Sequence, residues 1–334
     1  MNMFSPQAAH SGRRTLFAGL VALTSLCALS SPLAHAQAYP SKPIHLVVPY
    51  GPGGNTDILA RVAAQKLGEV IGQPVIIDNK PGAYTLVGIR VAHAAAPDGY
   101  TLLMGNNGTA ILPFISSTPA GYNFSDWKAI GSMGTVPMVL SVPPSMPVKS
   151  MADLIAYDKA HPGSLNLGQV GGHTQLLAER LKYVTGLKVV DINFGSAAQA
   201  LTNVAGGQIQ MFIDGAPTSI ALHKADKIRI IAVASEKRLA QLPDVPTFKE
   251  QGFPAMTTSA WYSVFVQAKA PPAVIERLSA AMAKVITDPA VKERMVGAGG
   301  EPWTGSLSDF DAFITQDARA LGEDGKRSGY KLPQ

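Results

Sequence analysis

The feature that most constrains the fold of this chain is an apolar strand that runs through a glycine turn directly into an amphipathic helix. Ile44–Val48 is an apolar run suited to a buried strand, and Gly51-Pro52-Gly53-Gly54 follows it closely. Over residues 56–71 apolar residues recur every three or four positions, as in a helix with one buried face. At such a junction backbone N–H groups point outward at the positive end of the helix, so this turn is predicted to bind an anion.

The order of strand, turn and helix repeats along the rest of the chain, with proline-rich breaks at residues 136–147 and 242–246. This alternation predicts an α/β fold of mainly parallel sheets with helices on both faces. Further strands are predicted at residues 75–78, 100–104, 165–167, 189–193, 211–214, 228–234 and 261–266, and further helices at 86–96, 151–160, 173–184, 197–205, 273–287 and 307–321.

The first 36 residues have the pattern of a secretory signal peptide. Arg13 and Arg14 precede an apolar stretch at residues 16–29, and Ala34-His35-Ala36 supplies a small-x-small cleavage site. Two other export signals fit less well, because Phe17 lies one place later than the twin-arginine pattern prefers and Leu26 is large for a lipoprotein signal. We therefore expect cleavage after residue 36 and a protein of the periplasm.

Composition narrows the function of the remaining chain. Removal of residues 1–36 from 334 leaves 298 residues, enough for two domains. The only cysteine lies in the leader, which excludes disulfides, thiol catalysis and cysteine metal sites from the mature chain. The leader holds two arginines and no acidic residue, so the net charge falls from +5 to about +3. Without a run of basic residues we expect no nucleic-acid partner.

Catalytic and cofactor motifs are not found. The turn before the first helix superficially resembles a dinucleotide-binding fingerprint, but Thr56 stands at its last glycine position. There is no phosphate-binding loop, no G-x-S-x-G and no H-E-x-x-H, so no catalytic residue, cofactor or metal is predicted. Asp57, Asp98, Asp191 and Asp214 offer either an acid/base pair or ordinary capping and turn carboxylates.

Several blocks of sequence, in order and over nearly the whole mature chain, resemble the receptors of tripartite tricarboxylate transporters, the Bug-type solute-binding proteins. The resemblance is specific because each block spans several residues at the family's spacing. The blocks are residues 39–44, 48–54, 72–75, 78–83, 96–103, 201–214 and 242–247.

The resemblance implies a two-lobed periplasmic-binding-protein fold of type II, with a ligand cleft between lobes that are each a mainly parallel sheet flanked by helices. Residues 37–138 and 262–334 would form the first lobe and residues 139–261 the second. The protein would capture a dicarboxylate, tricarboxylate or aromatic carboxylate and deliver it to the membrane permease subunits of the transporter. A ligand-sensing adaptor for a membrane signalling protein, or a secreted hydrolase, are the alternative functions.

The resemblance also indicates which loops hold the ligand. In the family the ligand carboxylate is held by backbone amides and hydroxyls of the first strand–helix loop, and matching loops of the second lobe grip its far end. The residues expected at the ligand are Tyr50, Gly53, Gly54, Thr56, Asp57, Asn106, Thr109, His173, Thr174, Gln175, Phe194, Ser196 and Asp214.

Three positions depart from the family pattern. Phe194 stands where a lysine is common, Tyr84 where a small glycine is common, and Gln210 where an aspartate is usual. The first two would favour an aromatic or bulky carboxylate if they face the cleft. The alternative is that Phe194 packs into the core of its lobe and that Tyr84 lies outside the cleft.

Overall fold

The computed structural model describes residues 1, 3, 39–297, 300–328 and 331. Apart from positions 1 and 3, the predicted signal peptide lies outside the described residues. Residues from Pro40 onward form one compact unit, and everything below concerns that unit.

All nine strands of the described chain belong to one connected sheet with two sections. The first section, which we call the first lobe, has three parallel strands followed by two antiparallel ones. Its strands are, in spatial order, β2 (Val75–Asn79), β1 (Ile44–Val48), β3 (Thr101–Asn106), β9 (Ser259–Gln267) and the first part of β4 (Trp127–Val142).

The second section, the second lobe, is built on the last part of β4. From Met138 onward β4 pairs antiparallel with β7 on one side and with β8 on the other. β5 and β6 continue the sheet beyond β7 in parallel register. The bounds of these strands are Leu165–Gln169 for β5, Val189–Asn193 for β6, Met211–Gly215 for β7 and Arg229–Val233 for β8.

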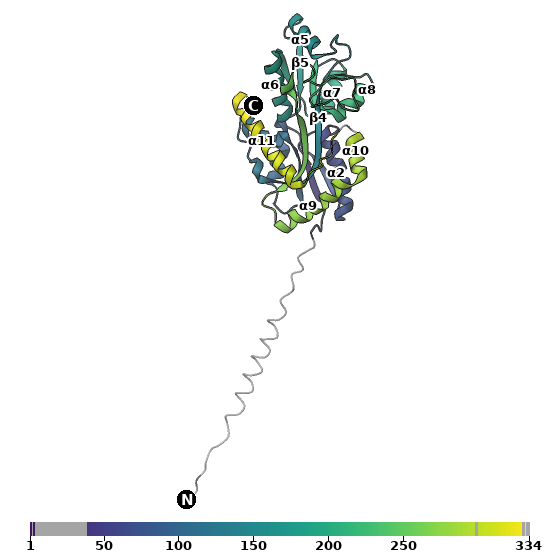
Figure 1. Ribbon diagram of the computed structural model, residues 1–334. Coiled ribbons are helices and arrows are strands. Elements are labelled where there is room, and N and C mark those ends of the chain that lie inside the picture. Colours follow the sequence, from purple (N-terminus) through teal and green to yellow (C-terminus); the bar gives the residue numbers. More distant parts are fainter. Residues whose placement is uncertain (2, 4–38, 298–299, 329–330, 332–334) are drawn as a thin grey trace. The chain divides into compact units, whose positions relative to one another are not determined.

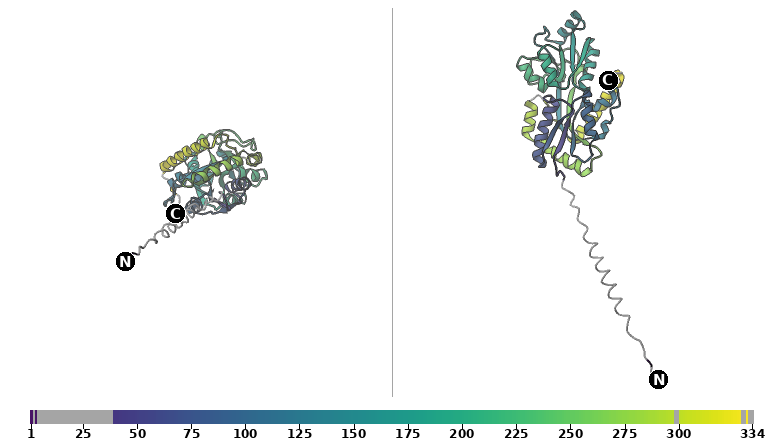
Figure 2. Two further views of the ribbon diagram at one scale, coloured as in Figure 1. Left: turned by 90° about the horizontal axis from the view of Figure 1, so that it is seen from below. Right: turned by 180° about the vertical axis from the view of Figure 1, so that it is seen from behind.

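The helices follow the same division. Figure 1 shows β4 running from the part that carries α2 and α9 into the part that carries α5, α7 and α8. Seen from behind, the teal and green middle of the chain lies at one end, whereas the purple segment and the light green helices lie at the other (Figure 2). The helices are α2 (Asn55–Ile71), α3 (Leu86–Ala94), α4 (Asn107–Ile115), α5 (Met151–Ala160), α6 (Gly172–Thr185), α7 (Ala197–Ala205), α8 (Ala216–Lys224), α9 (Pro272–Thr287), α10 (Pro289–Gly297) and α11 (Leu307–Ser328), with short 3₁₀ turns at Ala83–Thr85, Phe124–Asp126 and Pro254–Met256.

Helix α2 forms because its apolar residues line one face at helical spacing, as the sequence predicts. Leu59, Val62, Ala63 and Leu67 recur at helical spacing and are buried. The helix ends at Gly72, whose φ of 73° places it in the left-handed region that glycine adopts at low cost. This buried face holds the first turn of α2 in place at the end of β1.

The long strand β4 corrects the sequence interpretation, in which residues 136–147 form a proline-rich break. Pro137 lies inside the strand, at the position where β4 exchanges β9 for β7 and β8 as partners. Register shifts after Ala129 and after Ser132 absorb the glycines of this strand, and Gly134 has a φ of 82°. Glycine and proline therefore mark bulges and a change of partner here, not the end of the strand. Helices α4, α8 and α10 are also absent from the sequence interpretation.

A buried apolar cluster lies in the first lobe, between the sheet and the helices α4 and α11. Trp261, Phe265 and Phe310 are fully buried in it and pack edge to face. None of the helices in the described part of the chain is both long and apolar enough to cross a membrane.

Candidate functional site

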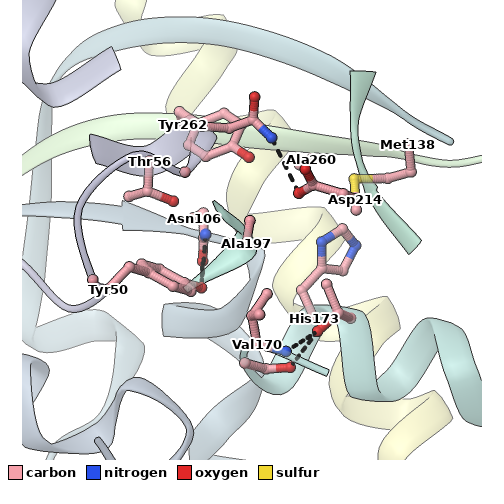
Figure 3. A pocket seen from close by; sticks show the side chains of 15 residues that line it. Tyr50, Thr56, Asn106, Met138, Val170, His173, Ala197, Asp214, Ala260 and Tyr262 are labelled. Atoms are coloured by element: carbon pink, nitrogen blue, oxygen red, sulfur yellow. Dashed lines mark hydrogen bonds between the residues drawn. The ribbon is translucent and has the colours of Figure 1, made fainter. Parts of the chain in front are cut away.

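A buried cavity of about 40 Å³ lies where the two lobes meet. Its wall combines the ends of β1 and β3 in the first lobe with the loops after β5, β6 and β7 in the second. Figure 3 shows these side chains around one pocket. The sequence-predicted residues that line it are Tyr50, Gly54, Thr56, Asn106, His173, Thr174 and Asp214.

The first-lobe wall is the uncapped start of α2. Gly54 is the N-cap residue and supplies no side-chain cap, so the first N–H groups of the helix have no partner from it. Gly54, Asn55 and Thr56 all line the cavity. Uncapped N–H groups at the positive end of a helix favour an anion, and the geometry predicted for this loop is therefore present.

Asp57 stabilises this loop from outside the cavity. Its carboxylate accepts hydrogen bonds from the backbone of Gly53 at 3.0 Å, from Arg61 Nε at 2.9 Å and Nη2 at 3.0 Å, and from Asn79 Nδ2 at 2.9 Å. Burial opposes ionisation, but the hydrogen bonds from Arg61, Gly53 and Asn79 outweigh it and lower the pKa of Asp57. Gly53 has a φ of 86°, a conformation that suits glycine. Asp57 and Gly53 thus shape the loop but do not line the cavity.

Tyr50 and Asn106 form a fixed pair on the same wall. The Tyr50 hydroxyl donates to Asn106 Oδ1 at 3.1 Å and accepts from Asn106 Nδ2 at 2.9 Å. Burial raises the pKa of Tyr50 to about 12. Asn106 also caps α4 by accepting from the backbone of Gly108, and Thr109 completes this capping box. Thr109 is therefore a buried support of Asn106 and lies outside the cavity lining.

The second-lobe wall begins at the loop between β5 and α6. Thr174 Oγ1 accepts from the backbone N–H of Val170 at 3.1 Å and donates to the carbonyl of Gly171 at 3.0 Å. The Thr174 hydroxyl holds this loop as the Asp57 carboxylate holds the first one, and α6 begins after Gly171 with no side-chain cap, as α2 begins after Gly54. His173 is buried beside it, and its Nε2 has no hydrogen-bond partner. Burial lowers the pKa of His173 to about 3, so its imidazole is neutral.

Asp214 is the last residue but one of β7 and is hydrogen-bonded directly to Asn55. Asn55 Nδ2 lies 3.1 Å from each of three acceptors in the second lobe, namely Asp214 Oδ1, the Gly215 carbonyl and Thr218 Oγ1. The Thr218 hydroxyl also donates to Asp214. Burial raises the pKa of Asp214 to about 6. Asn55 is thus a direct bridge between the lobes.

A backbone hydrogen bond forms a second bridge. The Gly51 N–H donates to the Gly195 carbonyl at 3.0 Å. A Cβ at position 51 would lie 2.9 Å from the Cβ of Ser196. The cavity volume of about 40 Å³ is well below the roughly 150 Å³ of a cavity that holds one benzene molecule. The two lobes are therefore closed on each other, and a ligand of several carbon atoms needs them to move apart.

Three further sequence-predicted residues lie near the site without lining the cavity. Gln175 donates to Asp191 at 3.1 Å, and Ser196 caps α7 by accepting from the backbone of Gln199. Phe194 packs against the apolar cluster around α7 and β7. Of the two alternatives for Phe194, the structure has the one in which it packs into its lobe.

Tyr84 is also absent from the cavity lining and packs against the core cluster of the first lobe. It is the middle of three successive non-glycine residues with positive φ: 45° at Ala83, 55° at Tyr84 and 83° at Thr85. Such conformations are uncommon outside glycine and cost free energy. The aromatic departures from the family pattern therefore do not reach the cavity.

Sequence reasoning did not select Asn55 and Tyr262, which also line the cavity. Asn55 lies within the loop that the sequence predicts to hold the ligand. Its position directly after the glycine turn could therefore have identified it as a site residue. Tyr262 comes from β9, and its side chain is hydrogen-bonded to Thr56. No sequence pattern connects β9 with this loop, because they are about 200 residues apart. Among the described residues no group of His, Cys, Asp or Glu is arranged to hold a metal ion.

Comparison with known proteins identifies the family. The family model described as the tripartite tricarboxylate transporter family receptor matches residues 59–323. A UPF0065 protein of Bordetella pertussis is 33% identical over 311 residues, which are 92% of this chain and 95% of that protein. The protein BugT of the same organism is 30% identical over 301 residues, which are 89% of this chain and 92% of that protein.

Two solved structures share the fold. The periplasmic binding protein BugD is 27% identical, with a TM-score of 0.83 over 88% of this chain and 99% of that one. Rpa4515 of R. palustris, solved with adipate, is 30% identical, with a TM-score of 0.82 over 88% of this chain and 100% of that one. The fold is thus the two-lobed α/β fold of periplasmic binding proteins. The chain belongs to the receptor family of the tripartite tricarboxylate transporters.

Proposed function

We propose that this protein is a periplasmic receptor that captures a small carboxylate between its lobes and delivers it to the membrane subunits of a tripartite tricarboxylate transporter. The observation that carries the proposal is the uncapped N-terminus of α2, which lines a buried cavity shared by both lobes. The family and the fold are those of solute-binding receptors, not enzymes. The adipate in Rpa4515 supports a carboxylate as the class of ligand.

The ligand carboxylate is expected at the first-lobe wall. N–H groups of Gly54, Asn55 and Thr56 would hold it through charge-assisted hydrogen bonds, either directly or through water. Tyr50 and Asn106 would limit its position on one side. Gly53, Asp57 and Thr109 would contribute to binding indirectly, because they fix the conformation of the loops that hold the ligand.

Capture would require hinge motion between two lobes. Residues 37–138 and 262–334 would form the first lobe, and residues 139–261 the second. The change of partners along β4 at Pro137 and Met138, and the start of β9 at Ser259, support these boundaries. The bridges from Asn55 and Gly51 exist only when the lobes are closed. A ligand that contacts both lobes would favour the closed state.

The predicted signal peptide supports a periplasmic location. Residues 1–36 would direct export and be removed, so that the receptor acts in the periplasm. Mass spectrometry of the protein purified from the periplasm should give an N-terminus at Gln37.

Titration calorimetry over a panel of acids tests capture. We expect at least one small carboxylate to bind, with Kd near ~1 μM, about 8 kcal/mol, which a few charge-assisted bonds in a closing cleft can provide. Small-angle scattering with that compound at saturation should give a smaller radius of gyration. Tight binding of neutral sugars or metal ions, with no carboxylate bound, would exclude the proposal.

A further inference from the structure

A larger hollow than the cavity lies between the two lobes at their hinge. This hollow, which we call the hinge groove, has a volume of about 690 Å³, against about 40 Å³ for the cavity. Its first-lobe wall contains Val296 of α10 and residues 300–302, and its second-lobe wall is formed by residues 234–241. Gln241 Nε2 donates to the Val296 carbonyl at 3.0 Å and so links the two walls.

The order of the strands places the hinge groove beyond β4, on the side away from the cavity. In the first lobe the cavity lies at the ends of β1 and β3, and β9 lies between β3 and β4. Glu301 of the groove pairs with Thr135 of β4 through two backbone hydrogen bonds, of 2.8 and 2.9 Å. Because β9 occupies one edge of β4, Glu301 lies at the other edge. The two strands that join the lobes, β4 and β9, therefore stand between the cavity and the groove.

The side chains of the joining strands support the same arrangement. Met138 and Ala260 line the cavity, whereas their neighbours Pro137 and Ser259 line the groove. Pro137 and Ser259 lie directly opposite each other in the pairing of β4 with β9. Successive side chains of a strand point to opposite faces, so one face of the joining strands is directed at the cavity and the other at the groove.

Rotation of the lobes about β4 and β9 would change the two spaces in opposite senses. The cavity is too small for a ligand of several carbon atoms, so the ends of β1 and β3 must move away from the second lobe for such a ligand to enter. With the joining strands as the axis, the same rotation moves Val296 and residues 300–302 toward residues 234–241. The groove is the free space that this movement uses.

We propose that the hinge groove sets the affinity of the cavity, because the groove has to narrow whenever the cavity opens. A group that fills the groove would thus hold the lobes closed. The inference rests on the proposed function, since it requires hinge motion of the lobes. The apparent affinity of a ligand for the closed state is reduced by the fraction of the protein that is closed, so a larger closed fraction gives a lower Kd without any change in the cavity.

Tryptophan substitutions that fill the groove test this inference. Ala240→Trp adds a ring to the second-lobe wall and Val296→Trp adds one to the first-lobe wall, and both positions are exposed, so the fold should be preserved. Calorimetry should give a Kd for a bound carboxylate roughly 10-fold lower than that of the natural protein. The matched control is Ala280→Trp, at an exposed position of α9 outside the lining of both spaces. This control should bind as the natural protein does.

Disulfide trapping measures the closed fraction without a ligand. A Cβ added at Gly54 would lie 3.3 Å from the Cβ of Ala197 in the other lobe, close to the roughly 3.5–4.5 Å of a disulfide. The pair Gly54→Cys and Ala197→Cys would therefore cross-link under an oxidant only when the lobes are closed, and the predicted mature chain has no other cysteine. We expect Ala240→Trp or Val296→Trp to raise the rate of cross-linking roughly 10-fold, and Ala280→Trp to leave it unchanged.

The two proposals fail in different ways. Folded tryptophan variants that bind with the natural affinity, or more weakly, would overturn the control of closure by the groove and leave capture of a carboxylate intact. If no acid of the panel binds, capture of a carboxylate is wrong, and the rate of cross-linking decides on the groove by itself. A rate that the two groove substitutions do not raise would then overturn this inference as well.

Discussion

The loops that open the two walls of the cavity have the same strand–turn–helix form and the same backbone hydrogen bonding, but a different kind of side chain holds each loop. After β1 the helix begins at Gly54, which provides no side-chain cap, and its N–H groups remain available at the cavity. After β5 helix α6 likewise begins after a glycine without a side-chain cap, Gly171, and the Thr174 hydroxyl accepts from the N–H of Val170 as the Asp57 carboxylate accepts from that of Gly53. Both helix starts therefore leave N–H groups at the cavity, and the loops differ in charge, because the first is held by a carboxylate paired with Arg61 and the second by a neutral hydroxyl.

The second wall also holds two buried groups that can ionise below pH 7. These are the Asp214 carboxylate, whose pKa burial raises to about 6, and the imidazole of His173, whose pKa burial lowers to about 3. On the first wall the Tyr50 hydroxyl stays neutral, because burial raises its pKa to about 12.

The largest effect is expected when the first wall loses its open backbone. Gly54→Val places a branched side chain where N–H groups face the cavity. A Cβ added at this position would lie 3.3 Å from the Cβ of Ala197. We expect Kd for the bound carboxylate to rise by roughly 100-fold or more, about 3 kcal/mol. The φ of −90° at this position is compatible with valine, so the melting temperature of the ligand-free protein should change little.

Calorimetry and thermal unfolding of Gly54→Val separate these two effects. If the variant binds normally, the anion site lies elsewhere. A variant that unfolds would instead show that Gly54 is required for the fold.

The second wall should show two opposite pH dependences of stability. The folded-state pKa of His173 is lowered from 6.5 to about 3, so its contribution to stability is lost as pH falls below 6.5. The folded-state pKa of Asp214 is raised from 3.8 to about 6, so stability is lost as pH rises from about 4 toward 6. Between pH 4 and 7 each contribution changes by roughly 2–3 kcal/mol, and they partly cancel.

Two variants uncover these contributions in urea unfolding of the ligand-free protein. Relative to the natural protein, the free energy of unfolding of Asp214→Asn should increase as pH rises from 4 to 7, and that of His173→Gln should decrease. Differences that do not vary with pH would mean that neither group is buried in solution as it is in the closed structure.

A smaller effect is expected at the hydrogen bond between Gly51 and Gly195, which bridges the lobes. Gly51→Ala places a Cβ 2.9 Å from the Cβ of Ser196 and 3.1 Å from the Gly195 carbonyl, whereas Gly195→Ala meets only Gln199 Oε1 at 3.9 Å. Because the clash at Gly51 arises only between closed lobes, Gly51→Ala should raise Kd by roughly 10-fold, equivalent to 1–2 kcal/mol. Gly195→Ala is the matched control and should bind as the natural protein does. Equal affinities for the two variants would argue against this closed arrangement as the bound state.

The smallest effect is expected at Thr174. Thr174→Ala removes two hydrogen bonds that hold the β5–α6 loop, so thermal unfolding should show a loss of about 1 kcal/mol of stability. Kd should rise less than ~3-fold, about 0.6 kcal/mol. A larger loss of affinity than of stability would show that the Thr174 hydroxyl contacts the ligand.

The local elements and the strand–turn–helix form of the loop after β1 could be predicted from the amino-acid sequence alone. The apolar period of α2 and the glycines before it are local signals, and the strand and helix ranges in both lobes follow from the same rules. The pattern failed in β4, where glycine and proline mark bulges and a change of partner. Bulges depend on the neighbouring strand, and one sequence does not contain that information.

Which side chains meet at the cavity depends on the folding of distant segments onto one another. Asn55 and Asp214 are 159 residues apart, and β9 brings Tyr262 to the first loop from still farther along the chain. Phe194 and Gln175 come after strand ends and Asp214 lies near the end of β7, yet Phe194 and Gln175 pack or pair outside the cavity. The strand ends limit which residues can reach the site, but the closing of one lobe on the other selects those that do, because burial and partner atoms arise only in the closed arrangement.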